Sequence, residues 1–190
     1  FRDAGHILGS AMIEVYVTED GETKKFLFSG DLGQPAQPII KDPAIVTGAD
    51  YLVLESTYGD RLHPAYEKES LAEIINDSIS RGGNLIIPAF AVGRTQTILY
   101  DIYKLWKEKR ISDVPVIIDS PLAIASTRVF VRNAQEFDDD ALEMLQKDGR
   151  LPQMPQLILC ESAEQSKELN THEGPAIIIS ASGMADAGRV

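Results

Sequence analysis

Three polar residues of kinds found in metal sites stand at the edges of apolar segments. His6 lies in Ala-Gly-His-Ile-Leu-Gly-Ser-Ala, Asp31 follows an apolar run in Ser-Gly-Asp-Leu-Gly, and Glu55 ends another in Leu-Glu-Ser-Thr-Tyr-Gly. Loops after strands often carry active-site residues. A hydrolytic metal centre needs three or more protein ligands, so His6 and Asp31 are too few to complete one. From residue types alone, ordinary loop roles are the stronger interpretation for both, as they are for His63 and His172.

Small and hydroxyl-bearing residues follow the later apolar segments, at residues 88–94, 119–123, 160–162 and 180–184. In an open parallel sheet, ligands bind beyond the carboxyl ends of the strands, where free N–H groups at helix starts attract anions. Arg94 and Arg189 would add positive charge there, which favours a phosphate ligand. Helix capping is the alternative explanation for these serines and glycines. No Gly-x-Gly-x-x-Gly or Walker sequence occurs, so dinucleotide and P-loop sites are not indicated.

The elements that must position these residues begin with a β-rich region. Residues 11–17 and 23–30 are predicted strands, and the Asp20-Gly21 pair between them is a strong signal for a hairpin turn. Residues 34–48 contain three prolines and predict an irregular connection. A short strand is predicted over residues 51–54, so that it ends just before Glu55.

From about residue 67 the pattern changes to alternating helices and strands. Uniformly apolar strands separated by helices predict a parallel sheet covered on both faces, in a Rossmann-like α/β domain. We place the boundary with the β-rich region near residues 57–65. The predicted helices are 67–81, 94–109, 121–133 and 139–147, with a further helix starting within 183–189, and the predicted strands are 85–87, 116–118, 157–159 and 176–179.

The composition is that of an ordinary soluble globular protein. The chain has 190 residues, of which 44% are hydrophobic and 25% charged. No apolar run approaches the ~20 residues of a membrane helix, and the single cysteine, Cys160, fits a reducing compartment, so the cytoplasm is expected. A net charge of −11 argues against broad non-specific nucleic-acid binding but leaves room for a local basic cleft. Because the chain lacks an initiator Met and stops inside a predicted helix, we expect a piece of a longer protein.

Six segments, taken in order, closely resemble one known family. They are Ala-Gly-His-Ile-Leu-Gly-Ser-Ala, Phe-Ser-Gly-Asp-Leu-Gly, Glu-Ser-Thr-Tyr-Gly-Asp-Arg, Ile-Pro-Ala-Phe-Ala-Val-Gly-Arg-Thr-Gln, Asp-Ser-Pro-Leu-Ala and Ser-Ala-Ser-Gly-Met. Together they are similar to the β-CASP branch of the metallo-β-lactamase superfamily, which includes RNA-processing exonucleases and the nuclease of pre-mRNA cleavage and polyadenylation. The resemblance covers essentially the whole chain, and six ordered matches are far more specific than any one alone.

This resemblance implies a fold and a set of roles. Residues 1–60 would be part of a metallo-β-lactamase (αββα) domain, and residues 61–190 a β-CASP domain with its C-terminal end truncated. His6 would bind one zinc ion, Asp31 would bridge two, and Glu55 would orient a histidine from later in the parent chain. Arg94, Ser182, Gly183 and Arg189 are the candidates for holding the RNA backbone.

The implied activity is hydrolysis of single-stranded RNA by a hydroxide that two zinc ions activate in the full-length parent. The family's His-x-His-x-Asp-His segment is absent from this sequence, so we expect the fragment to hold no zinc or an incomplete centre and to be inactive. Two alternatives stay open: a non-catalytic relative that binds RNA or scaffolds a partner, and a metal hydrolase acting on another phosphodiester or on a small ester. The interpretation involves no membrane and leaves a homodimer open.

Overall fold

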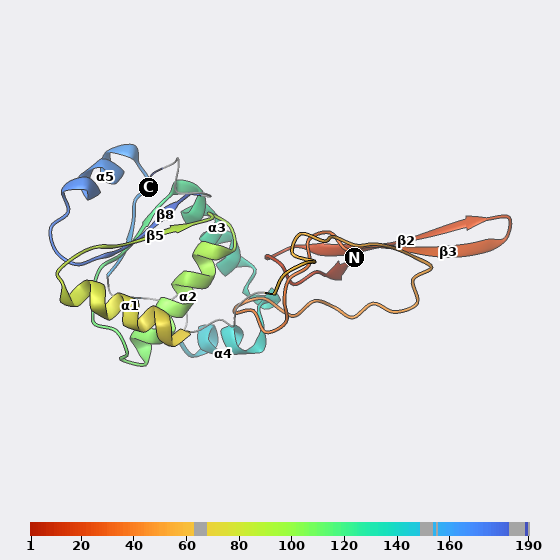
Figure 1. Ribbon diagram of the computed structural model, residues 1–190, viewed down its shortest axis with the longest axis horizontal. Helices are drawn as coiled ribbons and strands as arrows, with labels where there is room; N and C mark the ends of the chain where they lie inside the picture. The colour runs from red at the N-terminus through yellow and green to blue at the C-terminus, as the bar shows by residue number, and fades with distance from the viewer. Residues whose placement is uncertain (63–67, 149–153, 155, 183–188, 190) are drawn as a thin grey trace. The chain divides into compact units, whose positions relative to one another are not determined.

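The computed structural model describes residues 1–62, 68–148, 154, 156–182 and 189 (Figure 1). The chain divides into two compact units. Unit 1 comprises residues 1–65 together with residues 135–142, and unit 2 comprises residues 66–134 and 143–190. Each unit has its own four-stranded sheet and its own hydrophobic core.

Unit 1 is built on a long β-hairpin. Its sheet has the order β1-β2-β3-β4, formed by β1 (Arg2–Asp3), β2 (Ala11–Glu19), β3 (Glu22–Phe28) and β4 (Tyr51–Val53). The predicted hairpin turn is present, and both Asp20 and Gly21 have positive φ angles, 49° and 81°. A two-residue turn of this kind matches the right-handed twist of the flanking strands. β4 pairs with β3 in parallel, so the two strands end at the same edge.

The two faces of the hairpin differ in chemistry. One face is apolar and half exposed, with Ile13, Val15 and Phe28 among its side chains. The other face carries Glu14, whose carboxylate accepts from Arg2 Nε and Lys25 Nζ, both at 2.6 Å. Ala4, Met12 and Leu27 form a small buried cluster, and Ile39, Phe137 and Ala141 are also buried in this unit.

A short segment from late in the chain completes unit 1. It includes a single helical turn, η1 (Ala134–Glu136), and the first residues of α4 (Asp139–Asp148). Ile40 forms a β-bridge with Phe137, and the Asp138 backbone N–H donates to the Ile39 carbonyl at 2.8 Å.

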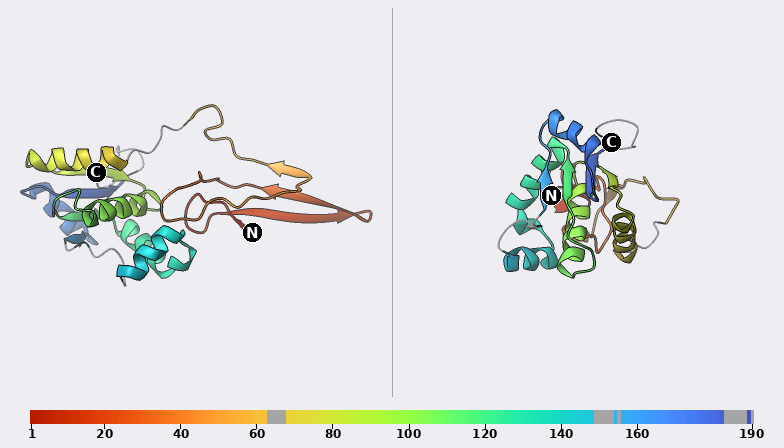
Figure 2. Two further views of the ribbon diagram at one scale, coloured as in Figure 1. Left: turned by 90° about the horizontal axis from the view of Figure 1, so that it is seen from below. Right: turned by 90° about the vertical axis from the view of Figure 1, so that its left-hand side faces the viewer.

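Unit 2 is the expected α/β domain. Its sheet has the order β5-β8-β6-β7, and every pair of neighbouring strands is parallel. The strands are β5 (Leu85–Ala89), β6 (Val116–Asp119), β7 (Leu157–Leu159) and β8 (Ile177–Ala181). The helices are α1 (Lys68–Ser80), α2 (Arg94–Lys107), α3 (Pro121–Arg132), α4 and α5 (Ala163–Glu168), followed by a turn, η2 (Leu169–Thr171). Figure 2 shows α1, in yellow, lying alongside the strands.

The two faces of the second sheet are covered unequally. Residues of α1, α2 and α3 pack on one face in the main core, which includes the fully buried Ile118 and Ile177. The other face has a small cluster around Ile117 and Ile178, and there Ile86 and Ile158 are about half exposed. The prediction of helices flanking a parallel sheet is confirmed, although in the described residues the second face is covered only in part.

The remaining differences from the predicted elements are small. β1 and α5 were absent from the sequence prediction. The predicted helix start at residues 183–189 falls largely outside the described residues, because residues 183–188 are not described. None of the described helices has the length and apolar character that crossing a membrane requires.

Candidate functional site

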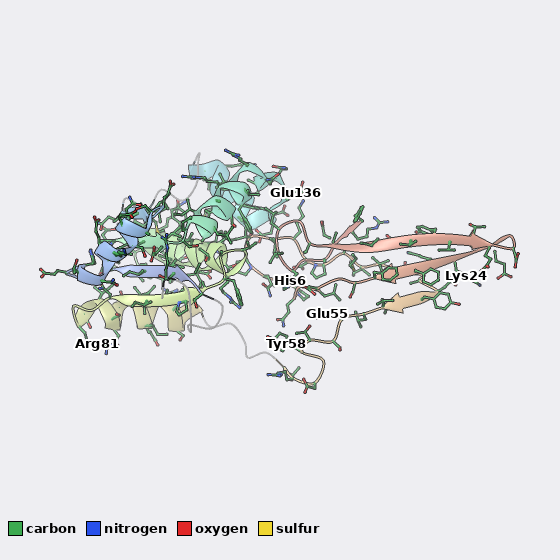
Figure 3. All side chains as sticks on the ribbon, turned by 90° about the horizontal axis from the view of Figure 1, so that it is seen from above. His6, Lys24, Glu55, Tyr58, Arg81 and Glu136 are labelled. Atoms are coloured by element: carbon green, nitrogen blue, oxygen red, sulfur yellow. The ribbon has the colours of Figure 1, made fainter. Side chains whose placement is uncertain are left out.

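Three loops at one end of the unit 1 sheet carry His6, Asp31 and Glu55. His6 lies in the loop before β2, Asp31 follows β3, and Glu55 follows β4. Because β2 is antiparallel to β3 and β4 is parallel to it, the start of β2 meets the ends of β3 and β4. Figure 3 shows His6 and Glu55 at this loop end, while Lys24 lies toward the hairpin tip. The topology therefore brings together three residues that are far apart in sequence.

Two glycines hold the His6 and Asp31 loops in backbone contact. A Cβ added to Gly33 would lie 1.5 Å from the Gly5 carbonyl oxygen and 2.7 Å from the His6 backbone nitrogen. The Gly33 N–H donates to the Ala4 carbonyl at 2.8 Å, which fixes this close approach. Gly5 has a φ of +63°, and a Cβ there would meet the Pro43 ring at 2.6 Å. Only glycine fits either position, because both the space and, at Gly5, the backbone angle exclude a side chain.

Glu55 is tied to the loop that carries Asp31. Its carboxylate accepts from the Leu32 backbone N–H at 2.9 Å and from the Thr57 hydroxyl at 2.7 Å. The hydrogen bond from Thr57, then that from Leu32, and more weakly the charge of His6 hold the pKa of Glu55 below its usual range. Buried Ser29 accepts from the Glu55 backbone N–H at 3.0 Å. Glu55 is therefore an ionised side chain that braces the residues directly after Asp31.

The side chains of His6 and Asp31 are exposed to solvent, while Glu55 is half buried. Imidazole nitrogen and carboxylate oxygen are donors that zinc accepts. Within the part of the chain that the structure describes, however, no three His, Cys, Asp or Glu side chains are grouped so as to hold a metal ion. The donor types fit a zinc centre and their number does not, so these residues by themselves do not form one.

The other candidate residues lie in unit 2, beyond the carboxyl ends of the parallel strands. Arg94 is the first residue of α2 and is exposed. Ser182 follows β8 and is largely buried, and its backbone N–H donates to the Ala89 carbonyl at 3.2 Å. Gly183 lies outside the described residues, as does His63. The capping alternative holds at one of these loops, where the Ser120 hydroxyl accepts from the Ala123 N–H at 3.1 Å and caps α3.

Arg189 is not a free cation. Its Nη1 donates to the carboxylate of Asp119 at 2.8 Å, and the Asp119 side chain is 3% exposed. The Ser166 hydroxyl donates to the second carboxylate oxygen of Asp119, also at 2.8 Å. The buried Asp119 carboxylate therefore offsets the charge that the partly exposed Arg189 would offer to a phosphate. Sequence reasoning assigned no role to Asp119, although an acid at the end of a uniformly apolar strand was a signal for one.

Comparison with known proteins gives consistent results. The Beta-Casp domain model matches residues 95–190. "Ribonuclease TTHA0252" of Thermus thermophilus is 36% identical over 194 positions, covering 100% of this chain and 43% of that protein. An "RNase J-like protein" of Methanocaldococcus jannaschii is 34% identical, covering 100% and 44%. "Endoribonuclease YSH1" of Eremothecium gossypii is 29% identical, covering 97% and 24%. The chain thus spans less than half the length of each of these relatives.

Proposed function

The chain belongs to the β-CASP family of the metallo-β-lactamase superfamily, and from that premise we propose that it is part of a metal-dependent ribonuclease. The reaction would be hydrolysis of phosphodiester bonds in single-stranded RNA. The support is that the whole chain, including the part before the matched domain, is similar to proteins named as a ribonuclease and an endoribonuclease.

The observation that carries this proposal is the backbone contact between the loops of His6 and Asp31. Gly33 leaves no room for a side chain between these two loops, and Gly5 leaves none beside Pro43, so the backbones that carry the imidazole and the carboxylate are fixed against each other. Leu32, in the Asp31 loop, also packs against the buried cluster of Ala4, Met12 and Leu27, so core packing contributes to this approach. A centre that must hold its ligands at a fixed separation would benefit from it.

We assign to these residues the roles that the family implies. His6 and Asp31 would be two ligands of a two-zinc centre, whose remaining ligands would come from parts of a longer protein outside these 190 residues. Such a centre supplies a hydroxide at neutral pH and stabilises charge on the phosphate oxygens. Glu55 would keep the Asp31 loop in place through its bonds to Leu32 and Thr57.

Unit 2 would hold the RNA strand rather than cut it. Arg94 is exposed and would bind a phosphate through its guanidinium. Arg189 would act indirectly, because Asp119 and Ser166 already hold it, and would contribute less charge to the strand than Arg94. Ser182 and Gly183 complete the proposed set.

The test is an Asp31→Ala substitution in the full-length protein, with hydrolysis of single-stranded RNA as the readout. We expect hydrolysis to be lost while the circular-dichroism spectrum stays unchanged, because Asp31 is exposed. The matched control is Asp20→Asn at the hairpin turn, which also removes one carboxylate from unit 1 and should leave hydrolysis intact. Cleavage at the wild-type rate in the Asp31 variant would refute the proposal.

A further inference from the structure

The loop between β5 and α2 presents apolar side chains to solvent next to a cation. Phe90 is 62% exposed and Val92 40% exposed, and Arg94 follows two residues later. No ion pair involves Arg94 in the described part of the chain. The full 190-residue sequence has a net charge of −11. An exposed arginine four residues after an exposed phenylalanine is therefore a local exception in an acidic protein.

Two buried polar side chains, Thr95 and Gln96, hold the backbone of this loop through hydrogen bonds. Thr95, which is fully buried, donates to the Phe90 carbonyl from its hydroxyl at 2.8 Å and from its backbone N–H at 3.2 Å. The Gln96 side chain accepts from the Gly93 N–H at 2.7 Å and donates to the Ala91 carbonyl at 3.1 Å. The carbonyls of Phe90 and Ala91 and the N–H of Gly93 are thus fixed by hydrogen bonds. This fixed backbone keeps the Phe90 side chain exposed to solvent.

Gln96 also ties this loop to the start of α3. Its Nε2 lies 2.9 Å from the Thr127 hydroxyl and 3.4 Å from the Ala123 carbonyl. One amide group therefore reaches both loops. Leu122, which precedes Ala123, is 63% exposed. We call the exposed side chains of Phe90, Val92, Leu122 and Arg94 the stacking shelf.

The chemistry of the stacking shelf suits a nucleobase with its phosphate. An aromatic ring stacks on any base, and a neighbouring arginine pairs with the backbone phosphate. A protein interface would need about 800 Å² from each partner, whereas three apolar side chains offer much less. The positive charge of Arg94 is complementary to a phosphate and gives no advantage to an apolar protein surface.

We propose that Phe90 is a nucleobase-stacking residue, that Val92 and Leu122 flank the stacked base, and that Arg94 binds the adjoining phosphate. Thr95 and Gln96 are positioning residues that hold Phe90 outward. The inference rests on the proposed function, because it takes single-stranded RNA as the ligand. It adds a contact to the bases, which the phosphate-binding residues do not supply.

The experiment measures binding of two ligands to the full-length protein in a metal chelator, which prevents hydrolysis. One ligand is a short single-stranded RNA, and the other is an abasic ribose-phosphate strand of equal length. Phe90→Ala should weaken RNA binding about five- to 150-fold, the range of base–aromatic stacking, and leave abasic binding unchanged. Phe90→Trp should retain RNA binding, because the indole ring also stacks.

Two further variants separate the contributions. Arg94→Ala should weaken binding of both ligands and lower the salt dependence by about one phosphate contact. Ile74→Ala removes a half-exposed apolar side chain from α1, an element that contributes no residue to the stacking shelf, and should change the binding of neither ligand. Equal weakening of both ligands by Phe90→Ala, or no weakening, would overturn the inference.

The result is independent of the test of catalysis. If RNA is hydrolysed and Phe90→Ala shows no preference for base-containing RNA, only the stacking shelf is wrong. If RNA is not hydrolysed while Phe90→Ala selectively weakens its binding, the shelf stands and the catalytic proposal fails.

Discussion

The two units of this protein stabilise their candidate residues in different ways. Unit 2 has a large core in which Ile75, Ile102, Leu105 and Ile118 are fully buried around a parallel sheet. Unit 1 has six buried apolar side chains among the described residues, against more than twenty in unit 2, and its hairpin leaves one apolar face half exposed. Unit 2 can therefore hold its loops by hydrophobic packing. Unit 1 depends more on backbone hydrogen bonds between its loops and on ion pairs such as those of Glu14.

The polar residues follow the same division. In unit 2, Asp119 is buried and already paired with Arg189. In unit 1 His6 and Asp31 are exposed, and only the backbone of their loops is fixed. A buried pair contributes to the fold of its domain, while exposed side chains on a fixed backbone are available to a ligand. Under the proposed function, this contrast suits a catalytic role for unit 1 and an RNA-binding role for unit 2.

The largest expected effect is on the core of unit 2. Ile118→Ala should lower the free energy of unfolding by about 2–5 kcal/mol, because the residue is fully buried in the central strand β6 and its loss leaves a cavity. Urea unfolding can be followed by the fluorescence of Trp106, the single tryptophan, which lies on α2 of unit 2.

The matched variant in unit 1 is Val15→Ala on the exposed face of the hairpin. Val15 is 38% exposed, so the expected loss is about 1 kcal/mol or less, measured by circular dichroism during urea unfolding. An equal cost for the two substitutions would mean that the hairpin face is packed in solution, and the contrast between the units would not hold.

The next largest effect concerns the contact between the loops of His6 and Asp31. Gly33→Ala places a Cβ where the Gly5 carbonyl lies, so the loops of His6 and Asp31 must move apart. A displacement of about 1 Å at a catalytic centre costs about 100-fold in rate. RNA hydrolysis by the full-length variant should fall by about that factor, measured with and without added zinc.

The control is Gly83→Ala, which adds the same methyl group in unit 2. There the nearest atom, the Ser78 carbonyl oxygen, is 3.8 Å from the added Cβ, and the backbone angle is not strained. Hydrolysis should be unaffected. If Gly33→Ala also hydrolyses RNA at the wild-type rate, the close approach of the two loops has no part in catalysis.

Much of the fold follows from local patterns that the sequence displays. The apolar runs at residues 116–118 and 176–179 predict buried parallel strands because they lack any polar alternation, and both are strands of unit 2. β1 has only two residues, which is too short for any periodicity. α5 has no apolar stripe, and its start depends on a capping box between Ser162 and Gln165.

The sequence predicts members of the candidate site only where the residue type and its neighbours in the sequence indicate a role. His6, Asp31 and Glu55 are identified because they stand at the edges of apolar segments and match a family pattern. The contact of Gly33 with Gly5 spans 28 positions and depends on how three loops meet, so no local pattern encodes it. The pairing of Arg189 with Asp119 also joins residues that are far apart in sequence. It explains why Arg94 can bind a phosphate more readily than Arg189, although both arginines follow strands of the same sheet.

The smallest expected effect is the pH dependence of the hairpin, and it tests whether charged ties stabilise unit 1. Hydrogen bonds from Lys25 and then Arg2 lower the pKa of Glu14 to about 2. An unfolded glutamate has a pKa of about 4.3. The stabilisation by Glu14 is therefore fully present above about pH 4.3 and is lost as the pH falls through 2. The difference in urea midpoint between wild type and Glu14→Gln should shrink across that window.

Glu143 provides the matched comparison in unit 2. It pairs with Lys147 one turn along α4, and its side chain is 64% exposed, against 8% for Glu14. Its pKa is also lowered by Lys147, but water screens an exposed pair, so Glu143→Gln should change the midpoint much less at every pH. Added salt should narrow the gap between the two variants. If Glu14→Gln changes the urea midpoint as little as Glu143→Gln does, the ion pairs of Glu14 with Arg2 and Lys25 do not stabilise unit 1. The backbone contacts around Gly5 and Gly33 would then be its main support.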